Sequence, residues 1–542
     1  MKPQKTQAWR SVYPLIRPYF GAIVTIHILT VLHSVIQVAV ALITKLVIDA
    51  ALTGSDQLWT WAVCLGGTLL TVVLLQSILS WLSGSTTDKC VAHIRQALLA
   101  AAGRSDAARL QEFHSGQLLS RGMEDVYTIC DGIFHTLPGA LGQLTRLIGA
   151  FCAIIVLYPA IAPVLLLACA AIVGSTAVLR PIMRRQHRHV RQADEQVASQ
   201  LQEDLQQLEL IQSLQMEQQT QLRFGQFVRK SLRARHIRRI WSVSISTYLS
   251  AISQLGSGVL LVWCAVRVAD HAMSYGALTA VLQLLAMLRS PVVGLSGIWT
   301  RLSAVEVAAE RLSQLLEQPE NTDAPAPALS VNAIVFESVT FHYPDDDTPV
   351  LDRLSLRLPL DSWACLTGIS GKGKSTMFKL ILGLYQPQEG RIYLETDNGS
   401  IPCSKATRHL FAYVPQDYSL FSGTVAENLQ LAAPEAREDQ QKQALHIAQA
   451  DFVFDLSAGQ HTPLKENTGL SKGQLQRIAI ARAILMDRPI FLLDECTSAL
   501  DVQTESALLD ALAQLGKQAL IVTHRPDALS DLPHAAMIPM DN

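Results

Sequence analysis

The stretch GISGKGKST, from Gly368 to Thr376, decides the fold of the second half of this chain. It matches the pattern G-x-x-x-x-G-K-[ST], follows the apolar run WACLT and precedes the apolar helical run TMFKLILGLY. In such a loop, glycines let backbone N–H groups wrap phosphates, the lysine reaches the β- and γ-phosphate oxygens, and the hydroxyl can bind Mg²⁺. The sequence therefore predicts a phosphate-binding loop with these contact residues: Gly368, Ser370, Gly371, Lys372, Gly373, Lys374, Ser375 and Thr376.

An apolar run that ends in two carboxylates, IFLLDE, lies at 490–495. A buried strand there would deliver Asp494 to the metal and Glu495 to the attacking water, which needs a base in line with the γ-phosphate. Short β-branched runs alternate with helical ones from IVFESVTFHY to QALIVTH. That alternation favours an α/β nucleotide-binding domain.

The composition indicates a second environment for the rest of the chain. The 542 residues have a mean hydropathy of +0.24 and only 17% are charged, so we expect part of the chain to lie in lipid. The net charge of −2 gives no support to a nucleic-acid partner. Nine scattered cysteines without a C-x-x-C pair are interpreted as reduced thiols, not as a disulfide or metal framework.

Six apolar stretches precede the nucleotide-binding half, each of roughly 20 residues or more and long enough to cross a hydrocarbon core of about 30 Å. The polar run after the fourth stretch holds RPIMRRQHRHVRQ and RKSLRARHIRR, so the positive-inside rule places the long polar runs and both termini in the cytoplasm. The predicted spans are Phe20–Leu46, Leu58–Leu82, Leu137–Leu157, Ile161–Leu179, Ser242–Val268 and Ala277–Ile298.

A proline-rich polar stretch, EQPENTDAPAPALSVN, separates the two halves. We therefore expect a six-helix transmembrane domain with long cytoplasmic extensions at 1–316, a linker at 317–332 and an α/β nucleotide-binding domain at 333–542.

A second loop that could bind an anion, LSKGQLQR, lies at 470–477. It reads as a polar loop that runs into a helix, which is the geometry that presents backbone N–H groups to an anion. The chain offers no obvious second ligand for this loop.

With these motifs in order, the second half resembles the ATP-binding cassette (ABC) transporters. LSKGQLQRIAIARA resembles the signature motif of that family, which implies that Ser471, Gly473 and Gln474 meet the γ-phosphate of ATP. In the family, the signature loop completes the ATP site of a second cassette. The resemblance therefore implies a dimer with a second half-transporter, either a homodimer or a heterodimer.

The resemblance also implies roles for residues outside the two loops. Tyr343 in FHYP would stack on adenine, and Asp501 in SALD would mediate cross-talk between the two sites. ATP and Mg²⁺ are the implied cofactors. The metal residues would be Ser375, Gln416 and Asp494, and the catalytic residues would be Glu495, His524 and Gln416.

The first half resembles the exporters of the family. FHSGQLLSRGMEDV and QSLQMEQQTQLRFGQF resemble the segments that lead into two cytoplasmic coupling helices, which we expect near Cys130–Thr136 and Gln212–Gln218. The resemblance implies a multi-pass protein of the cytoplasmic membrane with its ATPase domain in the cytoplasm. The signature-like loop departs from the family pattern at Lys472, where most members have glycine. Lys472 is either a tolerated substitution or the mark of a weakened ATP site, which would suit a heterodimer.

The cargo is not fixed by the sequence. Arg146 and Arg289 fall inside predicted spans, where a charge costs roughly 2.5–3.5 kcal/mol, and they suggest a partly polar pathway or a partner on a neighbouring helix. The predicted activity is ATP-driven efflux of a small molecule, lipid or peptide. An exporter-shaped importer of a metal chelate and a non-transporting ATPase regulator are the alternatives.

Overall fold

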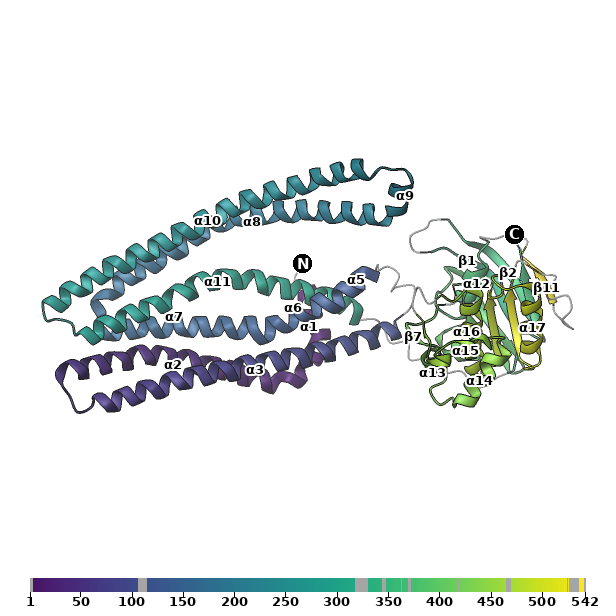
Figure 1. Cartoon of the computed structure of the whole chain (residues 1–542), viewed down its shortest axis with the longest axis horizontal. Helices are drawn as coiled ribbons and strands as arrows, with labels where there is room; N and C mark the ends of the chain where they lie inside the picture. Colours follow the sequence, from purple (N-terminus) through teal and green to yellow (C-terminus); the bar gives the residue numbers. More distant parts are fainter. Residues whose placement is uncertain are drawn as a thin grey trace. The chain divides into compact units, whose positions relative to one another are not determined.

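A computed structural model describes residues 3–105, 115–316, 330–343, 348–361, 363–368, 372–417, 419–464, 469–523, 525 and 536–540. The chain divides into two compact units. The first unit contains Met1–Ala100 and Gly116–Glu317, and the second contains Ala101–Ser115 and Gln318–Asn542. Long helices form the first unit, whereas sheets covered by helices form the second (Figure 1).

Short turns join the long helices of the first unit. The chain begins with α1 (Pro3–Ile16), the turn η1 (Arg17–Tyr19), α2 (Phe20–Thr53) and α3 (Leu58–Arg104). Two π-helical turns, η2 (Arg121–Asp125) and η3 (Gly132–Thr136), connect α5 (Ser115–Ser120), α6 (Val126–Asp131) and α7 (Leu137–Leu157). After η4 (Pro159–Ile161) come α8 (Ala162–Gln206), α9 (Leu208–Ser213), α10 (Glu217–Ala269) and α11 (Tyr275–Leu316).

Among the described residues, four helices are long and apolar enough to cross a membrane: Trp9–Thr53, Leu58–Arg104, Leu118–Leu157 and Glu217–Ala269. They contain the first, second, third and fifth predicted spans. Large apolar side chains on them are exposed, such as Trp59 at 78% and Leu255 at 71%, as expected for helices whose surroundings are lipid. The fourth and sixth predicted spans lie on α8 and α11, where many side chains, including that of Arg289, fall outside the described residues. These two spans stay predictions.

The structure contradicts the first predicted coupling helix. Cys130, Phe134 and Thr136 are buried, and Gly132 packs so closely against Val305 of α11 that a Cβ would clash. Most of the segment 130–136 therefore belongs to the core of the first unit, and His135 is its only exposed residue. The prediction was wrong because a helical pattern shows that a segment is amphipathic but does not show which element covers its apolar face.

The second predicted coupling helix coincides in part with α9, the short helix between α8 and α10 (Figure 1). Leu208, Leu210 and Leu214 on and after this helix are exposed. Exposed leucines at a helical turn between two long helices are suited to docking on another surface, so this prediction stays open.

Two larger sheets form the second unit. The antiparallel sheet has the order β2-β1-β4-β5, and the parallel sheet has the order β11-β3-β10-β9-β6. The antiparallel strands are β1 (Val331–Phe341), β2 (Leu351–Pro359), β4 (Glu389–Thr396) and β5 (Gly399–Pro402). The parallel strands are β3 (Trp363–Thr367), β6 (Phe411–Val414), β9 (Ile490–Asp494), β10 (Gln518–Val522) and β11 (Ala536–Pro539). A short pair, β7 (Gly423–Thr424) and β8 (Pro463–Leu464), completes the strands among the described residues.

Helices pack against the parallel sheet, and its strands β3, β9 and β10 are almost fully buried, as is typical of parallel sheets, whereas the edge strand β11 is partly exposed. All five residues of β9 are buried. The helices of this unit are α12 (Lys374–Ile381), α13 (Val425–Ala432), α14 (Glu438–Ile447), α15 (Phe452–Asp455), α16 (Lys472–Leu485) and α17 (Val502–Ala513). Short 3₁₀ turns lie at η5 (Lys405–Leu410) and η6 (Gly459–His461).

The parallel pairing places the carboxyl ends of β3, β6, β9 and β10 at one edge of the sheet. Asp494 at the end of β9 lies beside Val522 at the end of β10. Ligands of open α/β sheets bind at this edge, outside the carboxyl ends of the strands. The segments after β3, β6 and β9 hold the phosphate loop, Gln416 and Glu495, whereas Tyr343 follows β1 and Ser471 begins α16.

Candidate nucleotide site

The predicted phosphate loop begins directly after β3. Gly368 has φ +150°, and a Cβ there would lie 3.3 Å from the carbonyl oxygen of Met540. Gly373, which precedes α12, has φ +84°, and a Cβ there would lie 2.8 Å from the Leu351 side chain. Both positions therefore require glycine, for conformation and for space. Ser370 and Gly371, predicted between them, lie outside the described residues.

The lysine of this loop is buried at the start of α12. Lys374 is 5% exposed, and its Nζ donates a hydrogen bond to the carbonyl oxygen of Gly368 at 2.6 Å. The ammonium group thus lies against the backbone of the loop, where a phosphate could replace the carbonyl as its partner. Lys372, two residues earlier, is half-buried.

The two predicted metal residues from different motifs come together. The Ser375 hydroxyl donates to Oδ1 of Asp494 at 3.1 Å. A third group joins them, because the Tyr413 hydroxyl donates to Oδ2 of the same carboxylate at 3.4 Å. Asp494 is 1% exposed, and burial raises its pKa, whereas the bonds from Ser375 and Tyr413 lower it. Burial and the neighbouring carboxylate also raise the pKa of Tyr413, which keeps its hydroxyl protonated as a donor.

The predicted base lies next to the predicted glutamine. Nε2 of Gln416, in the loop after β6, donates to Oε2 of Glu495 at 2.7 Å. Glu495 follows β9 with φ +49°, a left-handed conformation that is uncommon for a residue other than glycine. Its backbone N–H donates to the carbonyl of Val522 at 3.0 Å, which holds this turn against β10. Strained backbone of this kind concentrates at functional sites.

The predicted adenine-stacking residue lies beside the start of α12. The Tyr343 hydroxyl shares a hydrogen bond of 3.0 Å with Oγ1 of Thr376, and Nζ of Lys379 donates to it at 3.4 Å. The rings of Phe341 and Tyr385 meet the Tyr343 ring edge-on at 5.1 and 5.4 Å between centroids. These contacts fix the ring next to the phosphate loop.

The signature-like loop caps its own helix. The Ser471 hydroxyl accepts from the backbone N–H of Gln474 at 3.2 Å, and the Gln474 side chain accepts from the N–H of Ser471 at 2.8 Å. This is a capping box at the start of α16. Gly473 is buried against the segment before α17, where a Cβ would lie 2.8 Å from the carbonyl oxygen of Ala499. Position 473 therefore requires glycine, because the backbone of Ala499 lies too close for a side chain. Lys472, between Ser471 and Gly473, is exposed.

Asp501 begins α17. It accepts hydrogen bonds from the backbone N–H and the hydroxyl of Thr504 at 2.9 and 2.8 Å, and these bonds lower its pKa. Asp501 therefore acts as a helix cap in this structure. Through Ala499 and Leu500, the segment before this helix also packs on Gly473.

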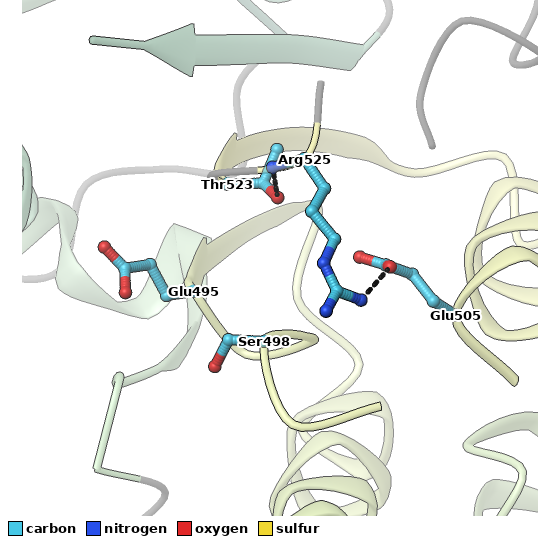
Figure 2. A pocket seen from close by; sticks show the side chains of 5 residues that line it. All are labelled: Glu495, Ser498, Glu505, Thr523 and Arg525. Atoms are coloured by element: carbon cyan, nitrogen blue, oxygen red, sulfur yellow. Dashed lines mark hydrogen bonds and ion pairs between the residues drawn. The ribbon is translucent and has the colours of Figure 1, made fainter. Parts of the chain in front are cut away.

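A cavity of about 240 Å³ lies next to Glu495 and is lined by Glu495, Ser498, Glu505, Thr523 and Arg525 (Figure 2). Arg525 points toward Glu505, whose carboxylate it meets at 3.5 Å, and it donates to the carbonyl of Leu500 at 3.2 Å. Glu505 is 2% exposed, so its carboxylate is paired inside the domain. The predicted residue His524 lies outside the described residues. Its neighbour Arg525 thus attaches this loop to α17.

Sequence reasoning missed Tyr413, Glu505 and Arg525. Tyr413 lies three residues before Gln416 in the same motif, so its place near the edge of the sheet was readable. The hydrogen bond from Tyr413 to Asp494 could not be read from the sequence, because it depends on the pairing of β6 with β9. One sequence feature could have pointed to Glu505, because it lies one turn into the helix that follows the SALD motif.

The site fits a nucleotide with a hard divalent cation. Mg²⁺ prefers oxygen ligands and is commonly held by one or two carboxylates together with substrate phosphates. The Ser375 hydroxyl and the Asp494 carboxylate supply converging oxygens next to the phosphate loop. No cluster of three or more His, Cys, Asp or Glu side chains that could hold a metal alone occurs among the described residues.

Comparison with known proteins matches both halves. Residues 23–292 match the family described as ABC transporter transmembrane region, and residues 351–498 match the family described as ABC transporter. A bacterial Atm1-family ABC exporter with ATP bound has the same fold, with a TM-score of 0.79 at 21% identity over 96% of this chain and 94% of that chain.

Two curated relatives carry the same name. The ATP-dependent lipid A-core flippase of Idiomarina loihiensis is 35% identical over 308 residues, which cover 55% of this chain and 52% of that protein. The ATP-dependent lipid A-core flippase of Chromobacterium violaceum is 29% identical over 518 residues, which cover 90% of this chain and 85% of that protein. The first alignment thus spans about half the length of the relative, whereas the second spans most of both chains.

Proposed function

This chain belongs to the ABC transporter family, as a half-transporter of the exporter type, and from that premise we propose that it exports an amphipathic cargo by ATP hydrolysis. The observation that carries the proposal is the pairing of Ser375 with Asp494 and of Gln416 with Glu495 at one sheet edge. A binding module would need the phosphate loop alone. A carboxylate base held beside a metal site is the equipment for hydrolysis.

In the proposed reaction, Lys374 leaves the Gly368 carbonyl and binds the β- and γ-phosphates of ATP. Glu495 orients the attacking water and accepts its proton, and the Gln416 amide keeps that carboxylate in place. Ser375 and Asp494 would hold Mg²⁺, which supplies charge neutralisation at the phosphates. Tyr343 would stack on the adenine, and His524 would contact the γ-phosphate.

We propose that the signature-like loop acts on the nucleotide of a second protomer. Ser471 and Gln474 are located at the start of α16, where backbone N–H groups and the helix dipole favour an anion. Among the described residues, the side chains of Ser471 and Gln474 form hydrogen bonds only within their own capping box. Gly473 supports the loop from behind by packing on Ala499. Asp501, close to that contact, would connect the two sites of the dimer.

The cargo class follows from the relatives and the helices. The relatives above are named as flippases of lipid A-core, and this chain has the apolar helices that a lipid pathway needs. We therefore propose a lipid or another amphipathic molecule as cargo, with small molecules and peptides as further members of that class. The protein would lie in the cytoplasmic membrane as a homodimer or heterodimer, with the ATPase unit in the cytoplasm.

Reconstituted vesicles test this proposal. With the ATPase units outward, ATP should move a fluorescently labelled phosphatidylethanolamine across the bilayer, and Glu495→Gln should reduce ATP turnover and lipid movement together, by about 100-fold or more. Glu435→Gln, the same change at an exposed glutamate away from the site, is the matched control and should behave as wild type.

The two parts of the proposal fail in different ways. Full ATP turnover by Glu495→Gln would remove the assigned base. Normal ATP turnover without lipid movement would instead remove the proposed cargo class and leave the ATP site intact.

A further inference from the structure

Two basic stretches of the first unit have no acidic residue in them. Residues 180–191 on α8 contain five arginines, and residues 223–239 on α10 contain seven lysines and arginines. The first stretch begins directly after the predicted fourth span, and the second ends just before the predicted fifth span. A charge-rich helix usually alternates both signs on its surface, so single-sign stretches at two adjoining places require an explanation.

Contacts between α8 and α10 bring the two stretches side by side. Ser231 donates to Oδ1 of Asp194 at 2.6 Å, and Lys230 donates to Oε1 of Gln196 at 3.0 Å. The helices run antiparallel and lie along each other (Figure 1). This register puts Arg188 of α8 level with Arg238 of α10, on the side of these contacts that faces the predicted spans.

Among the described side chains of the two stretches, the positive charge is neutralised only where Asp194 meets α10. Of the arginine side chains described there, only Arg235 forms an ion pair, with Asp194 at 3.0 Å. Arg185, Arg188 and Arg239 are exposed, whereas Arg238 is half-buried and, together with Ser231 and Arg235, lowers the pKa of Asp194. Like charges on facing helices repel, so this arrangement costs stability unless anions lie among them.

The distances of these arginines from the ends of the predicted spans place them near the lipid headgroups. At about 1.5 Å per residue, Arg188 lies about 14 Å beyond the end of the fourth predicted span, and Arg239 lies about 5 Å before the fifth. The headgroup layer is about 5–8 Å thick on each side of the hydrocarbon core, and charges act across a further 8–10 Å or so in physiological salt. The guanidinium groups are therefore within reach of lipid phosphates, which they can bind bidentately.

We propose that Arg185, Arg188, Arg238 and Arg239, here named the basic face, bind the phosphate groups of anionic phospholipids in the adjoining leaflet. The occupant is a lipid because the face continues directly from the apolar part of α10 and from the predicted fourth span on α8, and its charge is opposite to that of an anionic headgroup. Each basic residue near such a surface contributes about fivefold in affinity. This binding does not depend on ATP or on the cargo.

Lipid retention measures the binding directly. The purified full-length protein is equilibrated in detergent micelles with equal amounts of phosphatidylglycerol and phosphatidylcholine, and the retained lipids are quantified by mass spectrometry. Wild type should retain phosphatidylglycerol in roughly tenfold excess or more. Arg188→Gln/Arg239→Gln should reduce the excess to about twofold or less, whereas Arg188→Lys/Arg239→Lys, which keeps the charge, should retain most of it.

The matched control also removes two arginines, both on α10 and both farther from the predicted fifth span than Arg239. Arg223→Gln/Arg229→Gln should retain the wild-type excess. Equal retention of both lipids by wild type overturns the proposal, as does an equal loss in the control pair. Displacement of the phosphatidylglycerol by a millimolar concentration of inorganic phosphate at constant ionic strength also overturns it, because the site would then prefer a soluble anion. Failure of transport leaves this measurement unaffected, so the two proposals are tested separately.

Discussion

Replacing Tyr413 with phenylalanine removes one hydroxyl and keeps the ring. That hydroxyl donates to Asp494 at 3.4 Å, and the Tyr413 ring packs edge-on against Phe378 with 6.1 Å between centroids, a contact that phenylalanine preserves. A hydrogen bond to a charged group contributes about 1.5–3 kcal/mol, and the length of this one favours the lower end. The loss therefore corresponds to about tenfold in metal affinity, in the range known for residues that orient a metal ligand.

The pH dependence of this variant has a definite sign. Burial already raises the pKa of Asp494, and the bond from Tyr413 opposes that rise. Without the hydroxyl, the pKa of Asp494 rises further, so the carboxylate takes up a proton at a higher pH. A metal ligand must be deprotonated to bind. The acid limb of ATPase activity should therefore shift to higher pH, and more Mg²⁺ should be needed at each pH on that limb.

The assay is ATP turnover against Mg²⁺ concentration at fixed ATP, repeated between about pH 5.5 and 8. The matched control is Tyr393→Phe, which removes another hydroxyl that donates to a carboxylate, Glu337 at 2.6 Å, away from the site. The control should leave the Mg²⁺ requirement unchanged. A lower maximal rate for Tyr413→Phe with an unchanged Mg²⁺ requirement would refute the reasoning, because Tyr413 would then act on stability or on closure instead of on the metal ligand.

Two further substitutions test the supports of the site. Gly473→Ala places a Cβ 2.8 Å from the Ala499 carbonyl, so it should lower the free energy of unfolding by about 1–3 kcal/mol and abolish most ATP turnover; thermal unfolding and ATPase assays measure both. Arg525→Ala leaves the buried Glu505 carboxylate without its partner and should destabilise the protein by about 1–3 kcal/mol, and Arg525→Ala/Glu505→Gln should recover most of that loss in the same unfolding assay.

The sequence was most informative where a local motif sets the geometry. The phosphate loop could be placed because only glycine accepts the conformation at Gly373, and because the flanking strand and helix were readable from their apolar runs. The α/β order of the second unit followed from the same alternation. The polar run before the fifth predicted span and the span itself form one helix, α10, which runs unbroken from Glu217 to Ala269. That this helix continues beyond the membrane stays a prediction.

Sequence reasoning failed where packing between distant segments decides the outcome. The segment 130–136 has a helical pattern, but its burial depends on α11, and Gly132 meets Val305 across more than 170 residues of sequence. The bond from Tyr413 to Asp494 depends in the same way on strand register. Arg525 could not be separated from an ordinary surface arginine until its partner Glu505 was placed on α17.

The central claim is that the loop at Ser471 serves the nucleotide of another protomer, and cysteine cross-linking tests it most directly. Cysteines are placed at 372 in the phosphate loop and at 472 in the signature-like loop, in a Glu495→Gln background that retains ATP. Oxidation with ATP present should produce a covalent species of twice the chain mass, and omitting ATP should abolish it. Failure of that species to form with bound ATP, together with full ATP turnover by a monomeric wild-type chain, would contradict the account.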